Sequence, residues 1–479
     1  MPTVEKIVQN LSKGYTPQAQ GAPTRIAKIY ENTFKPLVNR KKLDTFFMIY
    51  DHEDPILKAW GFLGLYQILE NQSYESQNTL DKLNGVILDL LNDDREIKYL
   101  SGDIETRTTI RKHHVSRVCW LKQDFVFEPV FKYCEASMGK LDKVVSTLLE
   151  EVVSKHSDPK VESLLLDYAN QSQKHQIFAR RHIIKAFENF GEKSTIKNEK
   201  EVEKTFKTFL SELKEIPKSD KKRVLKDNII RIGAKLNLDL EEETLNFLRH
   251  LERPYDALKV VAERYKKNKR LYEILQKKLE ETKNRNFIND ILRAIIVIKD
   301  EIPNWKEIVI ENVKRNQLNK IDLIMDLNEA DLVDQSLILD FLQEGKDWQL
   351  EFIREYLITY PETIDKWKDL NREIISILDN YNHEGKELKP DSDLFRKKKM
   401  LLQLIIDLNL KELVDYCLKN FTHLNNDELR KMALFSIITF GEDKHLKQLR
   451  HLMEENKETE IYVKNFWNYL ERRDWKFYY

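Results

Sequence analysis

Apolar residues recur at helical spacing along almost the whole chain, and this pattern constrains the fold more than any other feature of the sequence. In one segment Phe287, Ile291 and Ile295 form a row, and equivalent rows return in segment after segment. Residues three or four positions apart share one face of an α-helix, so each row predicts an amphipathic helix with a broad buried face. We find no segment with the two-residue alternation of a strand. We therefore expect an all-α chain of roughly twenty helices.

The length and the scarcity of helix breakers indicate how these helices are arranged. The chain has 479 residues but only 12 glycines and 12 prolines, and 41% of its residues are hydrophobic although 33% are charged. Turn-rich β architectures need many more glycines and prolines, whereas this apolar content is enough to bury a core. Helices joined by short turns pack against their neighbours in sequence. We expect antiparallel helical hairpins stacked into a repeat array.

A weak internal repeat supports the array. The chain reads DPILKAWGFLGLYQIL from Asp54, NDELRKMALFSIITFG from Asn426 and DPKVESLLLDYAN from Asp158. Each copy opens with an Asp or Asn, whose side chain can cap a helix. In the first two copies an aliphatic and a basic residue follow, and Gly61 and Ala433 take the same slot.

This pattern resembles the second helix of HEAT repeats, where the small residue allows close approach of two helices. Two positions depart from it, because Glu162 replaces the basic residue and Leu165 the small one. The resemblance implies a HEAT-like α-α superhelix and says almost nothing about a ligand.

Polar or Gly- and Pro-containing stretches divide the array into predicted blocks. Residues 14–24 contain Gly14, Pro17, Gly21 and Pro23, which predict an arm or loop, while residues 191–203 and 382–393 read as a linker and a loop. The predicted division is an N-terminal arm at 1–24, helical-repeat blocks at 25–192 and 193–381, and a C-terminal HEAT-like block with an aromatic tail at 382–479.

Two features could bind a partner. Basic residues gather in three predicted helices between residues 107 and 231, and successive repeats of a solenoid place equivalent positions on one concave face. The last residues of the chain are densely aromatic, so they either cap the open end of the array or anchor a partner. The candidate binding residues are Arg107, Arg111, Lys112, Arg117, Arg180, Arg181, Lys222, Arg223, Trp475, Phe477, Tyr478 and Tyr479.

Catalytic and cofactor motifs are missing from the sequence. We find no GxxxxGK[ST] loop, no GxSxG elbow and no HExxH helix, so we expect no enzyme activity, no cofactor and no metal. Cys119, Cys134 and Cys417 show no metal-type spacing and read as buried free thiols. The N-terminus lacks the apolar core of a secretion signal and no stretch is long enough for a membrane span, so we expect a cytoplasmic protein.

These observations leave two functions open. The first is a non-catalytic scaffold or adaptor that binds a protein partner in an intracellular complex. The alternative is a nucleic-acid-binding HEAT-like protein that uses a basic concave surface in residues 107–231. The formal net charge of +0 argues against a protein devoted wholly to coating nucleic acid.

Overall fold

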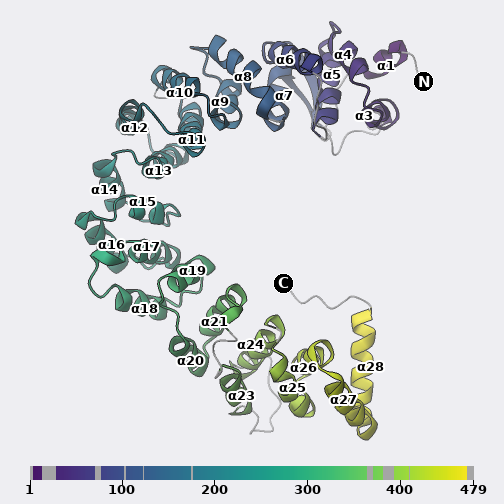
Figure 1. Ribbon diagram of the computed structural model, residues 1–479, viewed down its shortest axis with the longest axis vertical. Helices are drawn as coiled ribbons and strands as arrows, with labels where there is room; N and C mark the ends of the chain where they lie inside the picture. Colours follow the sequence, from purple (N-terminus) through teal and green to yellow (C-terminus); the bar gives the residue numbers. More distant parts are fainter. Residues whose placement is uncertain are drawn as a thin grey trace. The chain divides into compact units, whose positions relative to one another are not determined.

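A computed structural model describes residues 4–12, 28–70, 77–101, 104–121, 123–173, 176–363, 370–380, 393–408, 410–424 and 426–471. The chain divides into two compact units, Met1–Leu248 and Arg249–Tyr479. Helices dominate both units (Figure 1).

The first unit contains most of the predicted candidate residues. A π-helical turn at Tyr30–Phe34 leads into its second labelled helix, and one β-hairpin interrupts the helices. The elements are α1 (Val4–Leu11), α3 (Lys35–Asn39), α4 (Leu43–Tyr50), α5 (Pro55–Leu69), α6 (Gln77–Leu91), β1 (Glu96–Ser101), β2 (Ile104–Thr109), α7 (Ile110–Trp120), α8 (Gln123–Ala136), α9 (Lys143–Glu151), α10 (Pro159–Gln171), α11 (Ile177–Lys193), α12 (Glu199–Leu213), α13 (Asp220–Lys235) and α14 (Glu241–Arg249).

Helices of the first unit pack in two layers. One layer contains α5, α7, α9, α11 and α13, each in contact with the next, and the other contains the contacting pairs α6–α8 and α10–α12. Helices that follow each other in sequence also touch, as α10 touches α11 and α12 touches α13. This is the stacking of helical hairpins that the periodicity predicts, and it lets each helix bury its apolar stripe on two sides.

The second unit has the same construction. Its helices α17, α19, α21, α24 and α26 contact one another in series, and α20–α23 and α25–α27 pair on the other side. The elements are α15 (Leu258–Arg264), α16 (Lys269–Glu281), α17 (Arg285–Val297), α18 (Trp305–Asn316), α19 (Ile321–Glu329), α20 (Gln335–Glu344), α21 (Asp347–Thr359), α23 (Leu370–Asn380), α24 (Asp393–Asp407), α25 (Val414–Asn420), α26 (Asp427–Phe440), α27 (Asp443–Glu455) and α28 (Lys457–Glu471). The predicted all-α class of stacked helical hairpins is therefore confirmed in each unit.

The capping residues of the repeat act as predicted. The Asp54 side chain accepts a hydrogen bond from the backbone N–H of Ile56, and Asp158 accepts one from Lys160. Asn426 accepts bonds from the N–H groups of Glu428 and Leu429. These bonds satisfy donors that have no partner in the first turn of a helix, so a local signal is enough to set where each helix begins.

The β-hairpin was not expected, and the prediction that the chain has no strand is wrong at this point. Strands β1 and β2 pair antiparallel, with Glu96 opposite Thr109 and Ser101 opposite Ile104. A two-stranded hairpin is marginal by itself, and here β1 contacts α5 while β2 contacts α7. The sequence signal is short: a Gly-Asp pair lies between two segments of six residues.

The structure describes only some of the predicted boundaries between the arm and the helical blocks. Within the predicted arm, residues 4–11 form α1, because Ile7 and Leu11 lie on one face and are buried. Most of the remaining arm, and the loop at 382–392, lie outside the described residues. Contacts between α10 and α12 and between α11 and α13 continue the stacking past residue 192. The division into three blocks stays a prediction.

Close packing of α4 against α5 depends on glycine. A Cβ atom added at Gly61 would lie 2.5 Å from the backbone nitrogen of Tyr50 and 2.6 Å from its Cα, and one added at Gly64 would overlap the ring of Phe46. Backbone atoms cannot move aside as a flexible side chain can. Gly61 is the small residue that the HEAT-like pattern places in this slot.

We predict that Gly61→Ala destabilises the first unit, although Gly→Ala inside a helix ordinarily stabilises by about 1 kcal/mol. The overlap with Tyr50 should lower the free energy of unfolding by about 1–3 kcal/mol, measured by urea denaturation. Gly85→Ala on α6 is the control, because its added Cβ would meet nothing within 4 Å. A loss of stability in Gly85→Ala, or a gain in Gly61→Ala, would contradict this account.

Candidate functional site

The three basic helices belong to one layer of the first unit. Arg111, Lys112 and Arg117 lie on α7, Arg180 and Arg181 on α11, and Lys222 and Arg223 on α13, while Arg107 lies on β2. Helix α9 stands between α7 and α11 and contacts both. The tertiary structure therefore brings the basic helices to the same side of the hairpin stack.

Carboxylates lie among several of these cations. Arg107 pairs with Glu96 at 3.4 Å, and Arg223 pairs with Asp220 at 3.1 Å. Arg111 has two acidic partners, Asp94 at 2.5 Å and Asp142 at 3.0 Å, and its Nη1 also donates to the Tyr133 hydroxyl. A phosphate backbone would have to compete with these carboxylates, so the positive surface is interrupted.

Arg180 is part of the core. Its side chain is 2% exposed, and its Nε and Nη2 donate to the side chain and carbonyl of Ser172. Its Nη1 pairs with Glu212 at 2.5 Å, and its guanidinium lies 4.3 Å from the ring centre of Phe209. Arg180 therefore joins α11 to α12 and is not available at the surface.

The remaining basic candidates differ in their contacts and in their exposure to solvent. Lys222 donates to the carbonyl of Ile216 at 2.5 Å, and Arg181 is exposed on α11. Lys112 and Arg117 line a surface pocket of about 320 Å³ between α7 and the hairpin. Its other lining residues are Tyr99, Thr108, His113, Ser116 and Trp120.

Helix periodicity places these side chains together. Lys112, Ser116 and Trp120 are four residues apart on α7, and His113 and Arg117 form the adjacent row. Strand β2 contributes Thr108 and β1 contributes Tyr99, whose ring lies 5.1 Å from that of His113. The pocket thus combines two cations, the aliphatic hydroxyl groups of Thr108 and Ser116, and three aromatic rings, and none of its lining residues is acidic.

Trp120 is the most exposed large hydrophobic residue among those the structure describes, with 72% of its surface accessible. Tryptophan is seldom left in water on this scale, and an exposed aromatic group beside cations is typical of a binding surface. Our sequence predictions included Lys112 and Arg117 from this pocket but not Trp120, Tyr99, Thr108 or Ser116. Trp120 ends a basic segment that has no acidic residue between positions 107 and 120, and this was the available signal.

Arg117 is held in a partly desolvated position. Burial lowers the pKa of its guanidinium. Its Nη1 donates to the His113 carbonyl at 3.1 Å and lies 3.3 Å from Nδ1 of His114. No carboxylate pairs with Arg117 within the described part of the chain. The pocket therefore presents a cation whose lost hydration is only partly replaced.

The two histidines beside Arg117 are neutral near pH 7. Burial, and secondarily the charge of Arg117, lowers the pKa of His113 to about 4. His114 is 1% exposed, and burial holds its pKa well below the usual value. The positive charge of the pocket therefore comes from Lys112 and Arg117.

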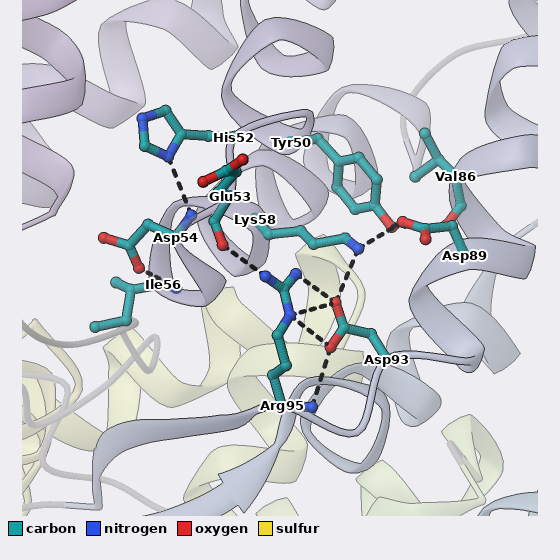
Figure 2. Close-up of polar contacts among 10 residues, drawn as sticks. All are labelled: Tyr50, His52, Glu53, Asp54, Ile56, Lys58, Val86, Asp89, Asp93 and Arg95. Carbon is teal, nitrogen blue, oxygen red and sulfur yellow. Dashed lines mark hydrogen bonds and ion pairs between the residues drawn. The ribbon is translucent and has the colours of Figure 1, made fainter.

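A buried ion cluster holds the base of the hairpin beside α5 (Figure 2). Lys58 of α5 donates to Asp93 at 2.8 Å and pairs with Asp89 of α6 at 2.5 Å. Arg95 contacts the same Asp93 carboxylate, with Nη2 at 2.6 Å. Figure 2 shows Lys58 and Arg95 converging on Asp93 from two sides.

This cluster connects to the first turn of α7, the helix that carries most of the pocket. The carbonyls of Arg95 and Asp93 accept hydrogen bonds from the N–H groups of Ile110 and Arg111, where α7 begins. Burial would raise the pKa of Asp93, but hydrogen bonds from Arg95 and Lys58 outweigh it and hold that pKa far below the usual range. The ionised carboxylate thus fixes the hairpin and the start of α7 together.

The other residues considered from the sequence give no evidence of a second functional site. Trp475, Phe477, Tyr478 and Tyr479 lie outside the described residues. Burial raises the pKa of the Cys119 and Cys417 thiols to about 12, and that of Cys134 as well, so none is an activated thiolate at neutral pH. In the part of the chain that the structure describes, no cluster of three metal-ligating side chains occurs, and no helix has the length and apolar character to cross a membrane.

No protein-family model and no curated protein matches the sequence. Solved structures match at low identity. A chain from a homology model of the full-length AP-3 complex is 12% identical with a TM-score of 0.38, over 94% of this chain and 79% of that one. A chain from a structure of Kap95p binding to RanGDP is 10% identical with a TM-score of 0.33, over 97% and 79%.

A third chain, from work on the interaction between cadherin and β-catenin, is 10% identical with a TM-score of 0.30, over 97% of this chain and 100% of that one. Likeness at these TM-scores carries no argument about this chain, whose stacked helical hairpins are established by the contacts among its own helices.

We predict that Asp93→Asn lowers the free energy of unfolding by about 3 kcal/mol at pH 7, because Lys58 would lose a buried partner. Glu96→Gln is the control, since it removes only the exposed pair with Arg107 and should change stability by less than about 1 kcal/mol. Urea denaturation measures both. Equal losses in the two variants would show that the buried cluster has no special role.

We also predict that acid destabilises the first unit before its carboxylates titrate. An unfolded histidine has a pKa of about 6.5, so His113 and His114 gain protons on unfolding once the pH falls below that value. The free energy of unfolding should fall by about 2 kcal/mol or more between pH 6.5 and pH 4.5. His113→Gln with His114→Gln should flatten this dependence.

The control for this pH series is His451→Gln on α27, because the His451 side chain is 70% exposed. That variant should keep the wild-type pH dependence. A double variant as acid-sensitive as the wild type would contradict the assignment.

Proposed function

We propose that this chain is a non-catalytic helical-repeat scaffold that binds a partner protein at the pocket between α7 and the hairpin. The observation that carries the proposal is Trp120, which is 72% exposed and lines the same pocket as Lys112 and Arg117. Tryptophan and arginine are enriched among the residues that dominate binding energy in protein interfaces.

The hairpin extends this surface. Residues of a strand alternate between its two faces, so Ile104 lies on the same face of β2 as Thr108. Thr108 lines the pocket, and Ile104 is 70% exposed. A large aliphatic side chain in water on the pocket's face of the hairpin supports a contact surface wider than the pocket itself.

The alternative, nucleic-acid binding through the basic helices, receives less support. Arg107, Arg111 and Arg223 pair with carboxylates, and Arg180 is buried. Strong binding of a phosphate backbone depends on many unpaired cations in a continuous track. The aromatic tail at Trp475, Phe477, Tyr478 and Tyr479 stays a predicted second anchor or end cap.

A tagged full-length chain should recover a stoichiometric protein partner from its native extract, with or without nuclease, and Trp120→Ala should reduce that recovery at least tenfold. Trp467→Ala on α28 is the matched control, because Trp467 is 46% exposed and is not a lining residue of the pocket. Mass spectrometry identifies and quantifies the recovered proteins. Recovery of nucleic acid alone, or a Trp120→Ala variant that recovers the partner fully, would refute the proposal.

A further inference from the structure

We propose that the pocket of Tyr99, Thr108, Lys112, His113, Ser116, Arg117 and Trp120 recognises a phosphorylated serine or threonine in an extended segment of the partner protein. This inference rests on the proposed scaffold function and specifies the chemistry of its partner. The apolar residue next to the phosphorylated one packs on Trp120.

The donors of the pocket match a phosphoryl group. Lys112 and Arg117 supply two positive charges, and Thr108 and Ser116 supply two hydroxyl groups. A phosphorylated side chain carries about −1.5 to −2 charges at neutral pH and three strong acceptor oxygens. A carboxylate has one charge and two oxygens, so it would leave part of this donor set unused.

The positive charge of the pocket is not neutralised from within. Arg111, one residue before Lys112, has two carboxylate partners, and Arg107 has one. The pocket itself has no acidic lining residue, and the structure shows no ion pair to Lys112 or Arg117 in the ranges it describes. An anion bound here would replace the hydration that Arg117 has lost, without displacing a protein carboxylate.

The size of the pocket favours a single side chain over a polynucleotide. Its volume of about 320 Å³ is at the low end of ligand pockets. A single-stranded nucleic acid needs a groove that follows several successive phosphates, and the flanking cations Arg107 and Arg111 are engaged by carboxylates. A short peptide segment needs one anion site and an adjacent apolar platform.

Trp120 provides that platform. It follows Ser116 by one helical turn on α7, so its ring lies on the same helix face as the Ser116 hydroxyl group. A tryptophan ring offers a large rigid contact area at little conformational cost. Specificity would then come from the phosphoryl group, and additional affinity from the residue that covers the ring.

The test uses three immobilised pools of degenerate 11-residue peptides that differ only at the centre, where they carry phosphoserine or phosphothreonine, unmodified serine or threonine, or glutamate. The full-length chain should be retained at least tenfold more strongly by the phosphorylated pool. Lys112→Met and Arg117→Met should each weaken this retention roughly tenfold, since each removes a charged donor. Trp120→Ala should weaken it as well.

Arg181→Met is the control, because Arg181 is an exposed arginine on α11 outside the pocket. Its retention should equal that of the wild type. Lys112 is exposed and its loss should leave the fold intact, so Lys112→Met remains informative even if Arg117→Met unfolds; urea midpoints identify any unfolded variant.

Three results would overturn the inference. The first is that the unmodified or glutamate pool retains the chain as strongly as the phosphorylated pool, and the second is that no pool retains it. The third is that the phosphorylated pool fails to retain the chain while a 30-nucleotide oligothymidylate binds it and Lys112→Met abolishes that binding. If the native partner is still recovered through Trp120 while the phosphorylated pool fails, the scaffold function stands and only its phosphate chemistry is refuted.

Discussion

The ion cluster of Lys58, Asp93 and Arg95 is the interaction on which the candidate site depends. A carboxylate 8% exposed would be costly without compensation, and here a lysine and an arginine both donate to it. Its position is what matters: the backbone of Asp93 and Arg95 also receives the first N–H groups of α7. Asp93 and Arg95 therefore link α5, the hairpin and the first turn of the helix that carries most of the pocket.

Charge in this layer is divided between two uses. Four of the eight basic candidate residues, Arg107, Arg111, Arg180 and Arg223, pair with carboxylates, and Arg180 also joins α11 to α12 from inside. Lys112 and Arg117 differ because their surroundings contain hydroxyl groups and aromatic rings in place of acids. This contrast distinguishes the proposed binding pocket from the solvated helix faces expected in a chain that is one-third charged.

The helical layers could be predicted from sequence because their determinants are local. Helix caps and apolar rows act within a few residues, as at Asp54 and in the row of Phe287, Ile291 and Ile295. A short turn then makes a helix pack against the next helix in the sequence. The hairpin escaped prediction because its strands are short and are stabilised by α5 and α7. Tertiary contacts override weak local preferences in such segments.

The sequence by itself determined the class of fold, the helix starts, the close approach at Gly61 and the set of basic side chains. Only the tertiary structure decided which of those side chains remain available, because ion pairing and burial depend on neighbours far along the chain. Glu212 comes to Arg180, and Asp142 to Arg111, from separate helices or turns. Lys112 and Arg117 become part of a candidate site only because the folded hairpin brings Tyr99 and Thr108 beside them.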